Sequence, residues 1–200
     1  MRGIIVSLAM LLCFACSEET KKEDRLKEAA STAEHSTERT DTIFLGYRLG
    51  MTESEFDQHT QHLQDIGKIK ADRFKDLYYP WPLEIDSDAR AKWSMGEYVQ
   101  DRLYSLMVGV ESDKISSPGL IQLLVMDAFD EKYGFNYHKT ESLISESPTY
   151  TWFKNNLRIE IMAGIADARI IYTDMTALKV KDSLDQQQRD SSLQQLRQDL

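Results

Sequence analysis

The sequence predicts an α+β domain over residues 42–175, built as an antiparallel sheet with two helices on one of its faces. Two segments with helical spacing of apolar residues are each followed by short apolar runs that are typical of strands. The chain therefore contains two successive helix-then-strands units. Neither unit alone carries enough apolar residues for a core, which favours a single domain. A polar helical tail is expected over residues 176–200.

The first helix is predicted over residues 52–66, after an extended apolar run that begins at Ile43. Thr52 is a good N-cap, because its hydroxyl can accept a hydrogen bond from an amide of the first turn. Glu55, three residues later, can accept from the Thr52 amide and so complete a capping box. Gly67 is suited to end the helix in a left-handed conformation.

Three strands are expected to follow this helix. The first, over residues 77–85, contains Pro80 and Pro82, which remove amide donors from the same side of the strand. Such a strand must lie at an edge of the sheet, with that side facing outward. A short strand is expected over residues 93–98, and residues 102–110 form the most apolar strand of this half.

The second unit begins with a helix over residues 119–133, which Ser117 can cap and Pro118 can open. Its apolar face is predicted to consist of Leu120, Leu123, Leu124, Ala128 and Phe129. Strands are expected over residues 150–153, 157–163 and 168–173. The first two of these flank Lys154-Asn155-Asn156, which suits a hairpin turn because asparagine tolerates positive φ.

Residues 1–15 have the features of a signal peptide, with a positive Arg2 and an apolar run too short to span a membrane comfortably. The run ends Cys13-Phe14-Ala15-Cys16, and a small residue directly before a cysteine resembles the lipobox of bacterial lipoproteins. The resemblance implies that Cys16 is acylated after cleavage and anchors the chain to the outer membrane of a Gram-negative bacterium, facing the periplasm or the outside. Cleavage after Ala15, giving a soluble secreted protein, is the alternative.

Residues 16–41 are expected to form a flexible tether between this lipidated cysteine and the domain. After Cys16 the segment has one leucine and no aromatic residue. Such a chain cannot bury enough apolar surface to offset its ordering entropy. A flexible segment of this length would reach roughly 25–30 Å, which holds the domain close to the bilayer.

The helix entry Leu49-Gly50-Met51-Thr52-Glu53-Ser54-Glu55-Phe56 resembles that of small envelope lipoproteins. These include the small lipoprotein of the outer-membrane β-barrel assembly machine and the folds similar to the β-lactamase inhibitor protein. Lys132-Tyr133-Gly134 and the hairpin with Trp152 are similar too, whereas Lys68 and Ile69 stand where the assembly-machine family has a proline. The resemblance implies the α+β fold, and because fold does not determine function it names no partner.

The charge balance excludes some partners. After residue 15 the chain has 23 basic and 33 acidic side chains, which argues against binding to nucleic acid or to anionic lipid head groups. Attachment to a membrane then depends on the acyl chains of Cys16. Both cysteines precede the domain, so the domain has no disulfide, thiolate nucleophile or cysteine-ligated metal.

No motif for catalysis, a cofactor or a metal is found, and we expect none of the three. Glu55, His59 and His62 share one helix at a spacing that zinc ligands use. However, Glu55 serves the capping box and His59 lies on the apolar stripe, so packed or solvated histidines are the preferred interpretation. Asp86-Ser87-Asp88 resembles part of a calcium loop without its glycine and final glutamate, and a polar turn explains it.

Tyr78, Tyr79 and Trp81 form the candidate partner surface, since aromatic residues between prolines on an edge strand offer a platform for a protein or a glycan. The preferred interpretation, however, is that Tyr79 and Trp81 face inward and belong to the core, because alternate residues of a strand share a face. The sequence thus favours a membrane-anchored envelope lipoprotein with a non-catalytic, partner-binding domain. An envelope hydrolase with acidic residues in a cleft is the second hypothesis, and converging carboxyl groups with raised pKa would distinguish it.

Overall fold

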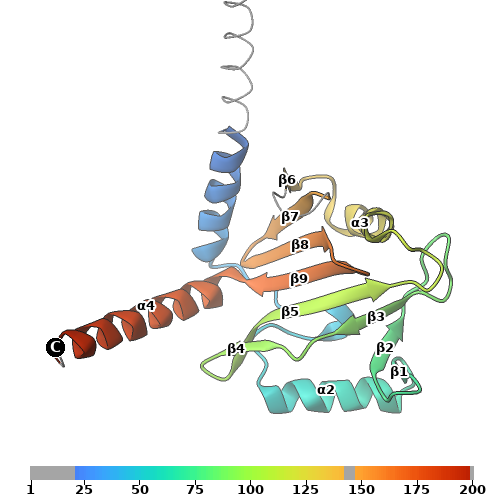
Figure 1. Ribbon diagram of the computed structural model, residues 1–200, viewed down its shortest axis with the longest axis horizontal. Helices are drawn as coiled ribbons and strands as arrows, with labels where there is room; N and C mark the ends of the chain where they lie inside the picture. The colour runs from blue at the N-terminus through green and yellow to red at the C-terminus, as the bar shows by residue number, and fades with distance from the viewer. Residues whose placement is uncertain (1–20, 142–146, 199–200) are drawn as a thin grey trace, which may run out of the picture.

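The computed structural model describes residues 21–141 and 147–198, so the predicted signal peptide and Cys16 lie outside the described residues. The strands of the described part form one antiparallel sheet, which confirms the predicted α+β fold (Figure 1). The helices are η1 (Phe44–Gly46, 3-10), α2 (Glu53–Asp65), α3 (Pro118–Tyr133) and α4 (Met175–Gln198). The strands are β1 (Lys70–Ala71), β2 (Leu77–Pro80), β3 (Arg90–Trp93), β4 (Glu97–Val99), β5 (Arg102–Glu111), β6 (His138–Thr140), β7 (Thr149–Lys154), β8 (Leu157–Ala163) and β9 (Ala168–Asp174).

The sheet is built from two halves that meet at its centre. Its strand order is β1-β2-β3-β5-β9-β8-β7-β6, and β4 pairs with the first part of β5. Strands β1–β5 come from the first helix-then-strands unit and β6–β9 from the second. The halves join where β5 pairs antiparallel with β9, from Ser105 opposite Thr173 to Val110 opposite Ala168. One continuous core spans both halves, as expected for a single domain.

Local signals in the sequence account for the starts of α2 and α3. The Thr52 hydroxyl accepts from the Glu55 amide, and the Glu55 carboxylate accepts from the Thr52 amide at 2.8 Å, so the predicted capping box is confirmed. Ser117 caps α3 by accepting from an amide of its first turn, with Pro118 at the first helical position. Gly67 follows α2 with a φ of 69°, as predicted.

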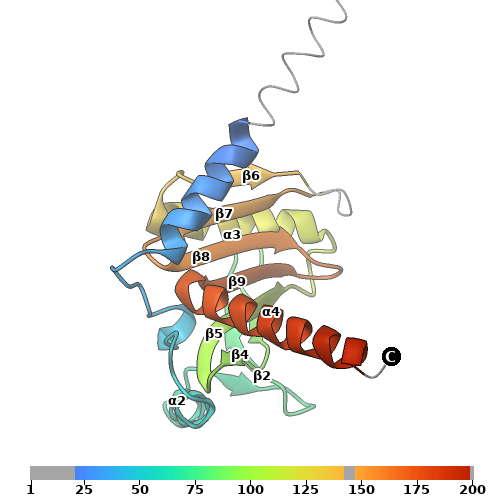
Figure 2. The same ribbon diagram turned by 90° about the vertical axis from the view of Figure 1, so that its left-hand side faces the viewer.

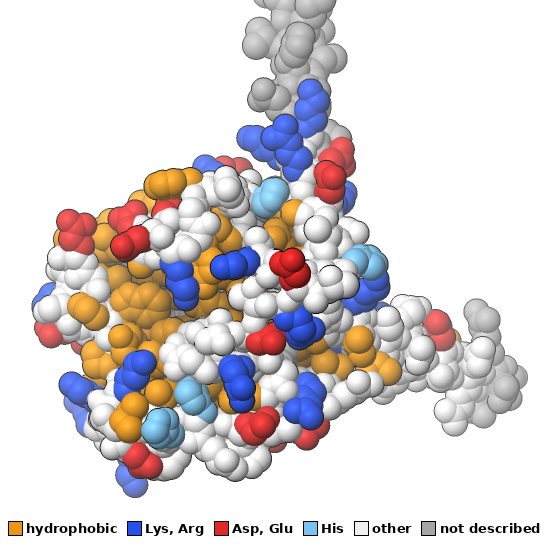
Figure 3. All heavy atoms as spheres, turned by 180° about the vertical axis from the view of Figure 1, so that it is seen from behind, with side chains coloured by type: hydrophobic (Ala, Val, Ile, Leu, Met, Phe, Trp, Pro, Cys, Tyr) orange, Lys and Arg blue, Asp and Glu red, His pale blue; other side chains and the backbone are white. Residues whose placement is uncertain are grey.

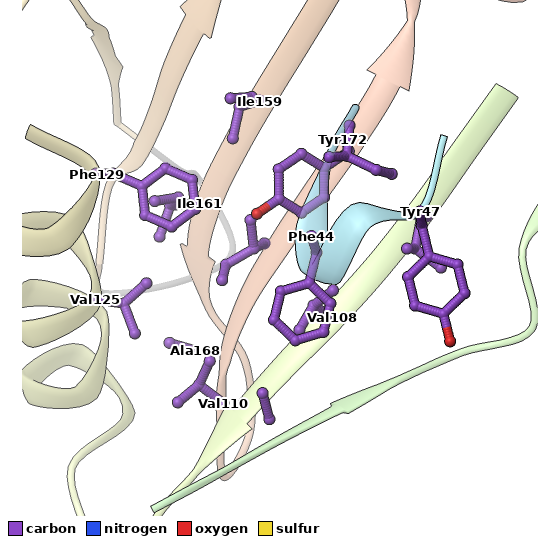
Figure 4. Close-up of a cluster of buried hydrophobic side chains, with 14 of the residues drawn as sticks. Phe44, Tyr47, Val108, Val110, Val125, Phe129, Ile159, Ile161, Ala168 and Tyr172 are labelled. Carbon is purple, nitrogen blue, oxygen red and sulfur yellow. The ribbon is translucent and has the colours of Figure 1, made fainter. Parts of the chain in front are cut away.

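The core lies between one face of the sheet and the segments that cover it. The inward side chains of β5, β8 and β9 are almost completely buried, and they include Leu106, Val108, Val110, Ile159, Ile161, Ala168 and Ile170. Val125 and Phe129 of α3 cover one part of this face, and Phe44 and Tyr47 cover another (Figure 4). α2 packs on Tyr47, whose ring stacks on that of Phe56 at 4.6 Å. Both helices therefore lie on the same side of the sheet.

The edges of the sheet differ from the prediction. β1 and β6 contain two and three residues, too few to produce a recognisable pattern in the sequence. Because β1 is present, β2 lies next to an edge strand, whereas residues 77–85 were predicted at the edge itself. β1 pairs only with the first two residues of β2, so neither Pro80 nor Pro82 is paired with β1. Residues 93–98 divide between β3 and β4 instead of forming one strand.

The predicted apolar face of α3 was wrong at Leu120, Leu123 and Ala128, which are all exposed. Leu120 and Leu123 are 41% and 52% exposed, while Ile121 and Val125 are completely buried. α3 is apolar around most of its circumference, so residue spacing alone did not identify the inward side. Gln122 also faces inward, where its amide donates to two backbone carbonyl groups of the second half.

The segment that precedes the domain is helical where a flexible tether was predicted. Residues 21–34 form a helix (blue in Figures 1 and 2), and Ala33 near its end is buried. The segment is rich in good helix formers, and Glu23 and Lys27 form an ion pair one turn apart at 2.8 Å. The prediction relied on low apolar content and gave too little weight to this propensity. The C-terminal tail is helical as predicted, and the far half of α4 projects from the body (Figure 2).

Candidate functional site

Phe44 is the centre of an aromatic cluster on the covered face of the sheet. Its ring stacks on that of Trp81, with 5.7 Å between centroids and 9° between planes, and meets Tyr79 edge-on at 5.9 Å. Trp93 lies 5.9 Å from both Phe44 and Tyr47. Phe44 and Tyr47 are buried, whereas Tyr79, Trp81 and Trp93 are only half-buried. The cluster therefore reaches from the core to the surface.

A strained turn holds Phe44 in this position. Leu45 has a φ of 52°, in the left-handed region that residues with side chains rarely adopt. The Tyr47 amide closes the turn on the Phe44 carbonyl oxygen, and a ring nitrogen of His59 in α2 bonds the Leu45 carbonyl oxygen at 3.1 Å. A Cβ at Gly46 would lie 3.5 Å from the His59 ring, so α2 and the turn are in close contact. The strain costs about 1–3 kcal/mol, and the turn leaves the Leu45 side chain half-exposed.

The surface beside this cluster is hydrophobic and hollowed. Seen from behind, hydrophobic side chains gather between the α3 side and the α2 side of the molecule (Figure 3). Leu45, Tyr79, Trp81 and Leu124 pack on the core without being fully covered. Leu120 is exposed one turn before Leu124 on α3. We call these five residues the hydrophobic face.

Tyr78, the third residue of the predicted partner surface, lies on the other side of the sheet. Successive residues of a strand alternate, so Tyr78 points away from Phe44. The Arg90 guanidinium lies 5.8 Å from the Tyr78 ring centroid, beside a shallow cavity of about 320 Å³. The three predicted residues therefore do not form one surface. Tyr79 and Trp81 face the core, against Phe44, which is the interpretation that the sequence favoured.

Of the three helical residues with zinc-ligand spacing, Glu55 and His59 are engaged in other contacts and His62 is exposed. Glu55 is bonded to Thr52, and His59 packs edge-on against Tyr47 at 4.7 Å while bonding to the η1 turn. Among the residues that the structure describes, no group of three or more His, Cys, Asp or Glu side chains could hold a metal ion.

Asp86 joins two loops through a buried carboxylate. Its side chain is 1% exposed, accepts from the Ser112 hydroxyl at 2.6 Å and the Asp88 amide at 2.9 Å, and pairs with Lys114 at 3.1 Å. The bond from Ser112, together with the Asp88 amide and Lys114, lowers the pKa of Asp86 below its usual range. These contacts agree with the polar turn that was predicted for residues 86–88.

Replacing Asp86 with asparagine is expected to weaken this connection and to lower the Tm at neutral pH. Because the pKa is lower in the folded state, the carboxylate stabilises the fold above about pH 4, and this contribution is lost as the pH falls through the folded-state pKa. The Tm difference from the wild type should therefore shrink on acidification, as measured by circular dichroism. Asp113→Asn, at a side chain that is 81% exposed, is the control expected to change little. A difference that is independent of pH would contradict this account.

The carboxyl groups of the described residues do not form a raised-pKa pair. Burial raises the pKa of Asp130 on α3, and the negative charge of Asp127 raises it further. The other described carboxyl groups whose pKa is shifted are all lowered; these are Glu23, Glu55, Asp72, Asp86, Asp174 and Asp185. Asp127, the carboxyl group whose charge acts on Asp130, lies one turn away on the same helix, so the two do not face each other across a cleft.

No family model, curated protein or solved structure matches this chain. Within residues 21–141 and 147–198, no helix has both the length and the apolar character that crossing a bilayer requires.

Phe44 is the site residue that the sequence analysis missed. The run from Ile43 was interpreted as extended chain leading to the first helix, so Phe44 received no role of its own. Gly46 and Gly50 both have positive φ, and these two glycines were the signal that the run turns back on itself. The partners of Phe44 come from β2, from Trp81 directly after it and from β3, far along the chain, and no local pattern could have named them.

Proposed function

We propose that this chain is a membrane-anchored envelope lipoprotein whose domain binds a protein partner through the hydrophobic face. In this proposal Cys16 supplies the anchor, at the end of the short apolar run. The partner contributes an apolar segment of polypeptide, because the hydrophobic face offers aromatic rings and leucine side chains. Sugar hydroxyls would require more polar partners than this lining supplies.

The observation that carries the proposal is the incomplete burial of Tyr79 and Trp81 over Phe44. Large aromatic side chains contribute most when they are covered, and partly covered aromatic residues beside a hydrophobic hollow are typical of interface anchors. The strained Leu45 belongs to the same surface, and strained backbone is concentrated at functional sites.

The alternative of an envelope hydrolase has less support. Asp130 is the described carboxyl group with a raised pKa, and no second one accompanies it in the described part of the chain. Glycoside hydrolysis, for example, needs two carboxyl groups on opposite sides of the bond that is cleaved.

Mass spectrometry of the protein purified from native membranes tests the anchor. We expect an N-terminal peptide that begins at Cys16 and carries the added mass of fatty acids. Cys16→Ser should abolish both the cleavage and the acylation. An intact leader, or an unmodified Cys16 in the mature chain, would contradict the lipoprotein assignment.

Site-specific photocrosslinking in the cells that make the protein tests the binding surface. A crosslinking amino acid at Leu120, on the hydrophobic face, should capture one protein, and Trp81→Ala in the same chain should reduce the yield at least about tenfold. The control position is Leu193 on the projecting half of α4, a leucine of similar exposure. Equal capture at both positions, or capture that Trp81→Ala leaves unchanged, would reject the hydrophobic face as the binding surface. Capture of glycan instead of protein would reject the assigned partner class.

A further inference from the structure

The chain between the N-terminal helix and η1 is tied to the second half of the domain. We call residues 35–42 the N-terminal strap. The strap leaves the helix of residues 21–34 near buried Ala33 and enters the fold of the first half, where the Leu49 amide donates to the Asp41 carbonyl oxygen. The predicted boundary at residue 42 therefore separates segments that are packed together.

Arg39 connects the strap to the junction of β9 and α4. Its guanidinium donates to Asp174 Oδ2 at 2.5 Å and to the Thr176 hydroxyl at 3.1 Å. The Asp174 side chain is 2% exposed, and its other oxygen accepts from the Thr176 amide and hydroxyl. The same carboxylate thus caps the start of α4 and holds the strap.

Thr40 connects the strap to the turn between β7 and β8. Its amide donates to Asn156 Oδ1 at 2.6 Å, and its hydroxyl accepts from the Asn155 amide group at 3.2 Å. Asn156 is completely buried, and its carbonyl oxygen accepts from the Met175 amide at the start of α4. The turn, the strap and the start of α4 therefore form one bonded unit.

The N-terminal helix also meets this unit directly. Its Ala29, Thr32 and Ala33 line one side of a groove whose other side includes Phe153 and Asn155. At the end of the helix, His35 lies 2.6 Å from the Lys179 ammonium on α4. The helix is thus supported from two directions near its C-terminal end.

We propose that the strap and the helix of residues 21–34 form a rigid strut that fixes the direction of the domain relative to its anchor. This inference rests on the proposed function, since the strut can orient the domain relative to a membrane only when Cys16 anchors the chain there. The described part of the helix, residues 21–34, spans about 20 Å at 1.5 Å per residue, and residue 21 follows Cys16 by five positions in the sequence. The helix leaves the body at the end opposite α2 (Figure 1). The hydrophobic face is then held at a set orientation to the bilayer, and a partner in the envelope meets it at a fixed height.

Hydrogen–deuterium exchange on the full mature protein tests the strut. We expect amides of residues 29–34 and the Thr40 amide to exchange at least about 100-fold more slowly than in an unstructured chain. Arg39→Ala should raise these rates at least about tenfold while the core amides of β8 and β9 keep theirs. The matched control is Arg25→Ala on the same helix, at an exposed side chain.

Exchange of residues 29–41 at the rates of an unstructured chain would overturn the strut and restore a flexible tether. Equal effects of Arg39→Ala and Arg25→Ala would also overturn it, because the strap contact would then have no specific role. The outcome is independent of acylation, which mass spectrometry of the same sample reports separately. A protected strut on an unacylated chain would reject the proposed anchor alone.

Discussion

Phe44→Ala is expected to lower the free energy of unfolding by about 3–5 kcal/mol, the range found when a buried phenylalanine is truncated. The side chain is 7% exposed and contacts the rings of Tyr79, Trp81 and Trp93. Its removal leaves a cavity that the η1 turn cannot easily fill, since His59 holds the turn through Leu45. Urea unfolding followed by tryptophan fluorescence measures the loss, and the stacked Trp81 should also change its native spectrum.

The matched control is Phe74→Ala in the turn between β1 and β2. Phe74 is 69% exposed, so its removal should change the free energy of unfolding by less than about 0.5 kcal/mol. Similar losses for the two variants would show that Phe44 is not the hub of the aromatic cluster. A variant that stays folded but no longer crosslinks from Leu120 would further link the cluster to partner binding.

The hollow follows from a difference between the two halves of the domain. In the second half α3 packs directly on the sheet through Ile121, Val125 and Phe129. In the first half Tyr47 lies between α2 and the sheet, stacked on Phe56 on one side and 5.9 Å from Trp93 on the other. α2 is thereby held away from the strands, and it does not close over the area beside α3. The inserted segment around η1 thus produces the opening where the hydrophobic face lies.

The sequence was informative where the signal is local. The capping box of Thr52 predicted α2 and the N-cap Ser117 predicted α3. The strand expected after the turn Lys154-Asn155-Asn156 is β8, with its observed bounds. Each of these signals depends on residues within a few positions of one another, where covalent geometry fixes the relation.

The features that were missed depend on contacts between distant parts of the chain. β1 and β6 exist because longer strands pair with them, and their own residues show no strand pattern. The strap is held by Asp174 and Asn156, more than a hundred residues away. Spacing on α3 could not show that Gln122 faces inward, because its partners are carbonyl groups of the second half. Such features are set by the tertiary structure, and the candidate site is one of them.

Asp174→Ala is expected to lower the free energy of unfolding by about 2–4 kcal/mol, because it removes both a helix cap and a charged hydrogen bond to Arg39. The carboxylate accepts at 2.6 Å from the Thr176 hydroxyl and at 3.0 Å from its amide, so α4 should fray at its start. Arg39 keeps a neighbour in Asp41, at 3.1 Å, but loses its buried partner. The loss should appear in urea unfolding, together with faster exchange of the strap amides.

Asp174→Asn removes the negative charge of this side chain and keeps its shape, so it tests the contribution of the charge alone. Burial alone would raise the pKa of Asp174, but hydrogen bonds from Thr176 and Asn156 and the charge of Arg39 outweigh burial and lower it. A carboxyl group with a lowered folded-state pKa stabilises the fold above about pH 4, and this stabilisation is lost as the pH falls through the folded-state pKa. The wild type should therefore lose stability more steeply than Asp174→Asn between about pH 4 and pH 2. Asp65→Asn on the exposed side of α2 should follow the wild-type slope, and equal slopes for all three proteins would show that the Asp174 charge does not hold the strap.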